Sequence, residues 1–140
     1  MKYKEALRRV EEGEKFEDLE ILRLADEDGT TIAHRQASRG WTTEDPEILR
    51  LANNKGWTVA HRQAWHGWVT EDPEILKLAD EDGWTIDHLQ VSRGWITEDP
   101  EILKLADKYG WTVAHRQAWN GWEPKTREAK IYVLTEKLKE

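Results

Sequence analysis

Apolar and polar residues follow one another in an order that returns every 27 positions along the chain. Each copy reads E-D-P-E-I-L-(K/R)-L-A, then a polar turn that ends in Gly, then T-(I/V)-A-H-R-Q-A and a Gly-Trp pair, with small changes between copies. Self-similarity at a fixed period of about 20–50 residues is typical of repeat architectures. The four copies occupy residues 17–43, 44–70, 71–97 and 98–124.

Each copy carries start and stop signals for two short helices. Asp45 is a strong N-cap, and Pro46 suits the first helical position because that residue needs no backbone donor. A polar turn that ends in Gly56 stops this helix. Thr58 is an N-cap for a second helix, which ends at Gly67. The pattern therefore predicts a helix-turn-helix unit in every copy.

A unit this short cannot bury its own apolar face, whereas stacked copies bury one another's. We therefore expect an all-α fold, an α-solenoid of about ten helices in a single repeat domain spanning residues 1–140. Residues 1–16 place Ala6, Leu7 and Val10 in register with a second helix and predict an N-terminal cap. Residues 125–140 predict a longer C-terminal cap helix.

The segment D-x-x-G-W-T-V-A-H-x-Q-A-x-x-G-W resembles the ankyrin signature D-x-x-G-x-T-P-L-H-x-A-A-x-x-G-H. Gly56, Thr58, His61, Ala64 and Gly67 fall on matching positions. The period is 27 residues instead of about 33, and Pro-Leu is replaced by Ile/Val-Ala. The resemblance implies a shortened ankyrin-like repeat that lacks the projecting β-hairpin finger.

Differences between the copies gather at a few positions. They fall at residues 27, 28 and 30 in the turn and at 33, 35, 38, 39 and 42 around the second helix, with their equivalents in later copies. In ankyrin-type binders this turn-plus-helix surface contacts targets. Assembly from modules explains the pattern better than natural drift, so we expect an engineered binder of a protein partner.

Four histidines recur with the repeat, at His34, His61, His88 and His115. Packed helices lie about 8–10 Å apart, which is too far for successive His side chains to share a metal ion at about 2 Å. We therefore expect each His to hydrogen-bond to its capping Thr. We expect no metal and no cofactor, and the sequence contains no catalytic or phosphate-binding motif, so we expect no enzyme.

The nine Trp divide into three classes. Trp41, Trp68, Trp95 and Trp122 stand in every copy and predict packing between repeats. Trp57, Trp84 and Trp111 stand at the turn in three copies, where packing and partner contact are equally open interpretations. Trp65 and Trp119 alternate with Ser at one position, so the fold does not require them. We expect these two residues to bind a partner.

The predicted partner-binding residues lie on the variable turn and second helix. Asp87 and Leu89 replace the Ala and Arg of other copies, through fitting to a target or through repacking. Trp and Arg are enriched at binding hot spots. The predicted set is Trp57, Trp65, His66, Trp84, Asp87, Leu89, Arg93, Trp111, Arg116 and Trp119.

Composition narrows the class of partner. Hydrophobic content is 38%, charged content is 35% and the net charge is −7. This charge disfavours nucleic acid and anionic membranes. No Cys is present, and no apolar run approaches membrane length. We expect a monomer, cytoplasmic if natural and soluble on recombinant expression if engineered. Two alternatives stay open: a designed scaffold with no ligand, and a carbohydrate-binding repeat protein whose aromatic faces are ringed by carboxylates.

Overall fold

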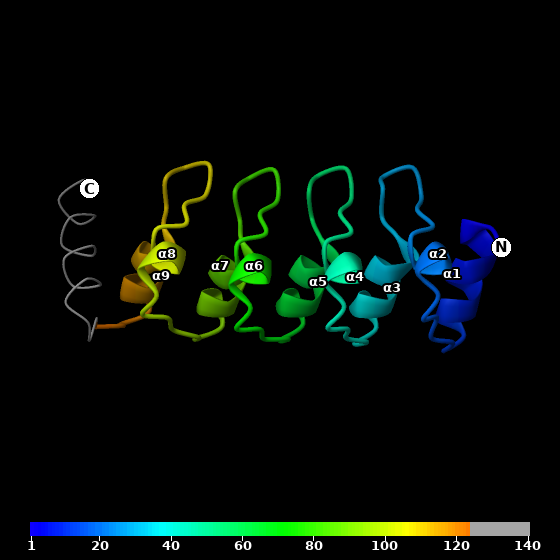
Figure 1. The fold of residues 1–140 in the computed structure, drawn as a ribbon, viewed down its shortest axis with the longest axis horizontal. Coiled ribbons are helices and arrows are strands. Elements are labelled where there is room, and N and C mark those ends of the chain that lie inside the picture. The colour runs from blue at the N-terminus through cyan, green and yellow to red at the C-terminus, as the bar shows by residue number, and fades with distance from the viewer. Residues whose placement is uncertain (124–140) are drawn as a thin grey trace. The chain divides into compact units, whose positions relative to one another are not determined.

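The computed structural model describes residues 1–123, and these residues form nine helices and no strand (Figure 1). The predicted all-α fold class is confirmed. The helices are α1 (Tyr3–Glu11), α2 (Leu19–Leu22), α3 (Ile32–Ser38), α4 (Pro46–Leu49), α5 (Val59–Trp65), α6 (Pro73–Leu76), α7 (Ile86–Ser92), α8 (Pro100–Leu103) and α9 (Val113–Trp119). The predicted C-terminal cap helix lies outside the described residues.

The chain divides into two compact units, residues 1–68 and residues 69–140. The boundary falls two residues before the end of the second copy of the repeat. Each unit therefore contains the helices of two copies, and each is described by itself below.

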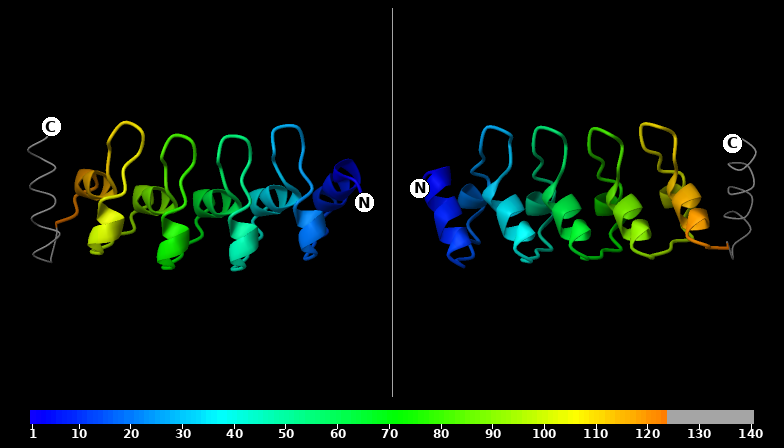
Figure 2. Two further views of the ribbon diagram at one scale, coloured as in Figure 1. Left: turned by 45° about the horizontal axis from the view of Figure 1, so that its top comes forward. Right: turned by 180° about the vertical axis from the view of Figure 1, so that it is seen from behind.

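In the first unit the longer helices lie side by side in chain order. Helix α3 packs on α1 and on α5, while α2 packs on α3 and α4 packs on α5 (Figure 2). Ala6 and Val10 of α1, in the segment predicted as the N-terminal cap, are buried in one cluster with Ile32 and Ala33 of α3. The polar residues of α1 are left on its outer side. This is the neighbour-to-neighbour packing of a helical solenoid.

The second unit repeats this arrangement. Helix α7 packs on α9, while α6 packs on α7 and α8 packs on α9. Ile86, Ile102 and Val113 are fully buried there. Every copy therefore contributes one single-turn helix and one two-turn helix, and within each unit the second helices of the two copies contact each other.

The caps lie where the sequence predicts them. The side chain of Asp45 accepts a hydrogen bond from the backbone N–H of Glu47, and Pro46 occupies the first turn. The first helix is only four residues long, because Leu51 and Ala52 leave it to enter the turn. The Leu51 carbonyl accepts from Val59 N, and Ala52 forms a single bridge with Thr58. These bonds close the turn over the second helix.

The turns project as loops (Figure 1), and within each unit a backbone hydrogen bond joins the two loops. Asp26 Oδ1 accepts from the backbone N–H groups of Asp28 and Thr30, which tightens the first loop. The carbonyl of Asp28 then accepts from Asn54 N at 2.9 Å. Each loop carries one isolated β-bridge and, among the described residues, none forms the strands of a β-hairpin finger.

A buried glutamine holds each copy to the segment before it. Gln63 of α5 accepts from Thr43 N at 3.0 Å and donates to Thr43 O at 3.2 Å. The same pair of bonds joins Gln36 to Phe16, Gln90 to Thr70 and Gln117 to Thr97. Because both bonds go to backbone atoms, the amide fixes the loop that leads into each first helix. We refer to these four glutamines as the glutamine clamps.

Candidate functional site

The four recurring histidines are structural, as the sequence predicts. The Nδ1 atom of His34 lies 2.7 Å from Thr31 Oγ1, and the corresponding distance is 2.7 or 2.8 Å for His61, His88 and His115. Each His backbone N–H donates to the same Thr hydroxyl, which completes a capping box. On the other side of the ring, His34 Nε2 lies 2.8 Å from the carbonyl of Trp57. The ring therefore links one copy to the next within the first unit.

Burial lowers the pKa of two of these histidines. The pKa of His34 is lowered mainly by desolvation, although its bond to the Trp57 carbonyl opposes this. Desolvation lowers the pKa of His88 in the same way. A neutral imidazole suits a ring that must accept from one neighbour and donate to another. These rings are therefore tied to the fold and are poorly placed for proton transfer to a ligand.

The tryptophans of the turn both pack and keep an exposed edge. The rings of Trp57, Trp84 and Trp111 lie 4.7 Å, 5.6 Å and 5.3 Å from the His ring of the same copy. Trp57 and Trp84 are half-buried, whereas 47% of Trp111 is exposed. Packing within the fold and exposure to a partner, the two interpretations left open by the sequence, are therefore compatible for these residues.

Trp65 and Trp119 lie at the ends of α5 and α9 and are exposed. Their exposed fractions are 58% and 80%. Ser38 and Ser92 occupy the same position in α3 and α7, where each hydroxyl donates to the carbonyl of the His one turn earlier. All four helices have the same length and the same capping box. The fold is thus indifferent to Trp at this position.

In the second unit, exposed aromatic rings line a pocket. Trp111, His115, Arg116 and Trp119 enclose a volume of about 300 Å³. The guanidinium of Arg116 lies 5.0 Å from the centre of the Trp84 ring, in a cation–π contact. The structure therefore brings together four of the predicted partner-binding residues, namely Trp84, Trp111, Arg116 and Trp119. We call Trp111, His115, Arg116 and Trp119 the tryptophan pocket.

The corresponding residues of the first unit are arranged differently. Trp57, His61, Arg62 and Trp65 have the same identities and spacing, but the rings of Trp57 and Trp65 are in edge-to-face contact at 6.5 Å. Burial and the nearby Arg35 lower the pKa of Arg62. Identical side chains thus adopt two arrangements in the two units.

The Gly-Trp tryptophans pack only in part. Among these four residues, Trp68 and Trp122 are half-buried, and Trp68 Nε1 donates to Glu44 at 3.0 Å. Trp41 and Trp95 are exposed, with 40% of Trp41 accessible. Trp41 and Trp95 are therefore less buried than the predicted packing between repeats implies. Lys15 Nζ lies 4.9 Å from the centre of the Trp41 ring.

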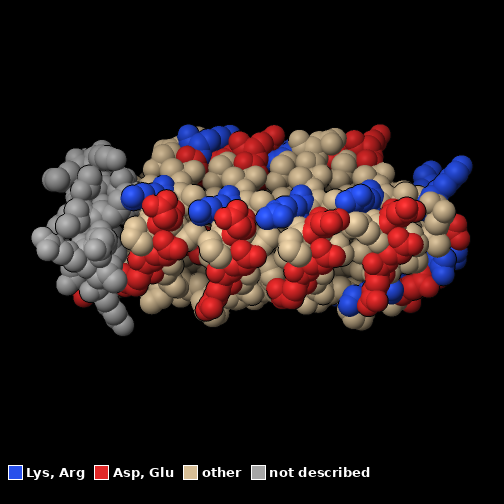
Figure 3. Space-filling model, in the orientation of Figure 1, with Lys and Arg blue, Asp and Glu red and all other residues tan. Residues whose placement is uncertain are grey.

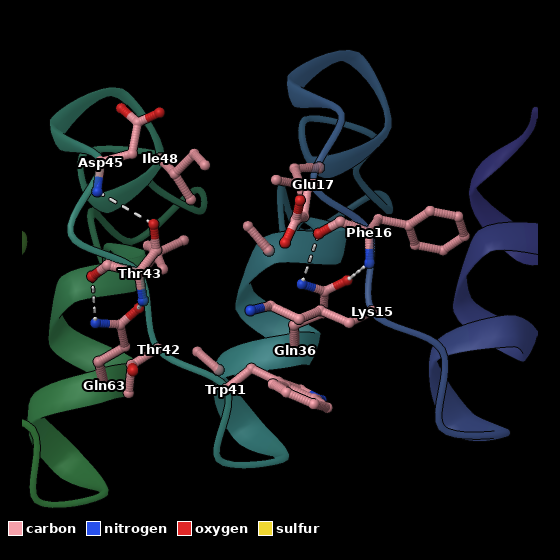
Figure 4. A pocket seen from close by; sticks show the side chains of 14 residues that line it. Lys15, Phe16, Glu17, Gln36, Trp41, Thr42, Thr43, Asp45, Ile48 and Gln63 are labelled. Atoms are coloured by element: carbon pink, nitrogen blue, oxygen red, sulfur yellow. Dashed lines mark hydrogen bonds between the residues drawn. The ribbon is translucent and has the colours of Figure 1, made fainter.

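Trp41 also forms one wall of a cleft in the first unit (Figure 4). The cleft has a volume of about 250 Å³ and an apolar floor that includes Ala33, Ala37 and Val59. Gln36 and Gln63 line it, but their amides are already bonded to the backbone of Phe16 and Thr43, as the dashed lines in Figure 4 show. The sequence did not predict this cleft, because small residues such as Ala33 and Ala37 indicated close packing and not open space.

Copy three carries Asp87 and Val91 where copy one has Ala33 and Ala37. Both larger residues are buried, and 4% of Asp87 is exposed. Leu89 is buried as well. The prediction that Asp87 and Leu89 contact a partner is therefore wrong for this fold, because neither side chain reaches the surface. Of the two interpretations offered for these changes, repacking fits the structure.

Asp87 is an unusual core residue. Its Oδ2 atom is buried and has no hydrogen-bond partner among the described residues. Burial raises the pKa of Asp87 to about 7, and the negative charge of Asp99 adds to this effect. A carboxyl in this setting is protonated at mildly acidic pH.

The remaining predicted residues lie at helix ends. His66 follows α5 as its C-cap and is exposed, and Arg93 has the same place after α7.

The first helices carry a different surface, on which acidic side chains gather in each unit (Figure 3). Their members in the first unit are Glu17, Asp18, Glu20, Glu44, Asp45 and Glu47, all exposed. The Asp residues among them are the N-caps described above.

Among residues 1–123, no group of three or more His, Asp or Glu side chains is placed to hold a metal ion. Within the same range, no helix has the length and apolar character needed to cross a membrane.

The comparisons with known proteins give no family. No model of a known protein family matches the chain, and no curated protein matches it. The fold and the residues described above therefore carry the functional argument alone.

Proposed function

We propose that this chain is a non-catalytic, engineered, ankyrin-like repeat scaffold that binds a protein partner through the variable turns and second helices. The partner contacts the exposed tryptophans of these elements together with the neighbouring arginines. Two features support the ankyrin-like and engineered origin. The Thr–His capping boxes recur at the positions of the ankyrin signature, and several differences between copies fall at exposed positions such as Ser38 and Trp65.

One observation carries the proposal: Trp65 and Trp119 are exposed at a position where Ser supports the same helix. A large exposed aromatic ring favours association, so a scaffold made only to fold gains nothing from it. A Trp that becomes buried against a partner removes about 150–250 Å² of surface from water. Trp is also among the residues most enriched at hot spots. Recognition explains these two residues, whereas helix formation does not.

The test uses the full chain immobilised against an array of purified folded proteins. Each protein that binds is then measured against the double variant Trp65→Ser, Trp119→Ser. We expect its affinity to fall by about 100-fold, because the loss of two hot-spot side chains costs several kcal/mol. Helical content should stay as it is, because Ser already occupies the position in α3 and α7, and the melting temperature should fall only slightly through loss of the contact between the Trp57 and Trp65 rings.

The matched control is Ser38→Ala with Ser92→Ala, which changes the same helix position in the other two copies. It removes only a side-chain bond to a helix carbonyl and should leave binding intact. Affinity that survives in the Trp double variant would show that the surface is assigned wrongly. An array without any binder would favour the alternative of a scaffold that has no ligand.

A further inference from the structure

The tryptophan pocket and its counterpart in the first unit contain the same four residue types at the same spacing. In the first unit Trp57 and Trp65 contact each other. In the second unit, about 300 Å³ is open beside Trp111 and Trp119. That volume lies at the small end of ligand pockets, so it can accept one or two side chains of a partner. The two Trp rings of this set of four residues are therefore in contact in the first unit and apart in the second unit.

The arginine of this set has a different neighbour in each unit. Copy three has Trp84 there, and its ring holds the Arg116 guanidinium at 5.0 Å. Copy one has Thr30, so Arg62 has no such ring beside it. Contact with an aromatic face orients a guanidinium but leaves its N–H groups able to donate in the plane. Trp84 thus presents Arg116 at the edge of the pocket.

The described lining of the pocket contains a positive charge. Arg116 is the one formally charged side chain among the described residues that line it. No carboxylate within residues 1–123 forms an ion pair with Arg116. Guanidinium groups bind carboxylates in a paired, charge-assisted geometry. The walls are apolar indole faces, which favour an apolar side chain beside that carboxylate.

We propose that the tryptophan pocket binds a peptide segment of the partner in which an apolar side chain is next to an Asp or Glu. The apolar side chain lies between the rings of Trp111 and Trp119, and the carboxylate accepts hydrogen bonds from Arg116. This inference rests on the proposed function and deepens it, since it states the chemistry of the segment that is recognised.

A random peptide library displayed against the full chain tests the proposal. We expect the enriched peptides to share an apolar residue next to Asp or Glu. One such peptide is then synthesised, with a second version that carries Gln in place of the acidic residue. The affinities of both peptides are measured for the unchanged chain and for Trp119→Ser and Arg116→Gln, with circular dichroism to verify the fold.

Trp119→Ser should weaken binding of the acidic peptide by about 10-fold or more. Arg116→Gln should weaken the acidic peptide by about 10-fold and should leave the Gln peptide nearly unchanged, because the two changes remove one shared interaction. The controls are Tyr109→Ser, an exposed aromatic of the same unit, and Lys104→Gln, which removes one positive charge from the same unit. Both controls should bind as the unchanged chain does.

Three results overturn the inference. They are a consensus without an acidic residue, an acidic peptide whose affinity is insensitive to Arg116→Gln, and a library that yields no binder. None of these results bears on the array experiment with folded proteins. A chain that passes that test and fails this one would bind its partner through other residues of the variable surface.

Discussion

At the scale of single residues, Asp87 is a charged residue type at a buried position that is otherwise Ala. The other three copies have Ala33, Ala60 and Ala114 at this position. A buried carboxyl without a partner must either stay protonated or hold a charge away from water, and both cost free energy. The chain therefore carries one position where the repeat pattern itself suggests a more stable residue.

We expect Asp87→Ala to stabilise the second unit at pH 8. The folded-state pKa is about 7 and the ordinary value is 3.8. Between these values the folded state holds the proton and the unfolded state does not. The contribution of Asp87 to the free energy of unfolding is therefore most favourable at low pH and falls as the pH rises toward and through 7. Full ionisation costs on the order of 2–4 kcal/mol.

Urea denaturation at pH 5 and at pH 8 measures this effect. The stability gained by Asp87→Ala should be larger at pH 8 than at pH 5, and Asp87→Asn should remove the pH dependence without removing the polar atoms. An equal change at the two pH values would contradict the raised pKa.

Asp87 and Leu89 also mark a limit of prediction from sequence. Their departure from the repeat pattern was visible, but the pattern does not state which face of a seven-residue helix is covered. Trp65 and Trp119 were placed correctly on the surface, since Ser at the same position already implied that the core did not need them. A substitution between copies therefore reveals tolerance only when the alternative residue is small and polar.

At the scale of elements, close contact between neighbouring loops depends on glycine. Gly29 has φ of +78°, and a Cβ there would lie 2.6 Å from Asn54 Oδ1 and 2.9 Å from Asn54 N. Gly40 has φ of +91°, but a Cβ there would meet nothing within 4 Å. The two positions share the left-handed conformation and differ in crowding.

We expect Gly29→Ala to destabilise the first unit more than Gly40→Ala does. Each substitution carries the cost of a positive φ, about 1–2 kcal/mol, and only Gly29→Ala also forces the Asn54 backbone to move. An additional loss of about 1 kcal/mol or more is the expected outcome, measured by thermal unfolding. Equal losses for the two variants would show that the loops are free to separate.

The elements themselves were largely predictable, because Asp-Pro, Thr and Gly have strong local preferences at helix ends. The glutamine clamps were not predicted. A Gln stands at the position of Gln36 in every copy, but a polar side chain on a helix is ordinarily expected to be exposed. Only the fold brings the amide to a backbone segment 20 residues earlier. The first helices also proved shorter than their apolar run suggested, since Leu51 and Ala52 pair with the turn.

At the scale of the whole molecule, the two units should respond differently to acid. Burial lowers the pKa of His34 in the first unit and of His88 in the second, from an ordinary value of 6.5. An unfolded chain binds protons at these sites more readily, so acidification below pH 6.5 destabilises both units. In the second unit, protonation of Asp87 acts in the opposite direction over the same range.

Hydrogen exchange at pH 7.5 and pH 5.5 measures this difference. After correction for intrinsic exchange rates, we expect amides of α3 and α5 to lose protection on acidification. Amides of α7 and α9 should lose less, and Asp87→Ala should remove that difference. Protection that falls equally in both units of the unchanged chain would contradict the opposing roles of His88 and Asp87.

The division into two units was not expected from a repeat that continues without interruption through residues 17–124. Sequence periodicity reports which residues each copy has, whereas the extent of contact between copies depends on the side chains that meet. The order of helices and their neighbour packing followed directly from the period. The grouping of copies did not.

The glutamine clamps have a consequence for how such a chain can be lengthened or shortened. Each amide binds the main chain of the residue before its copy, and that residue is Phe16 in one case and Thr in the other three. These two hydrogen bonds therefore do not depend on the side chain of the residue that the amide binds. We therefore expect these two backbone bonds to form again when a whole 27-residue block is added, deleted or exchanged.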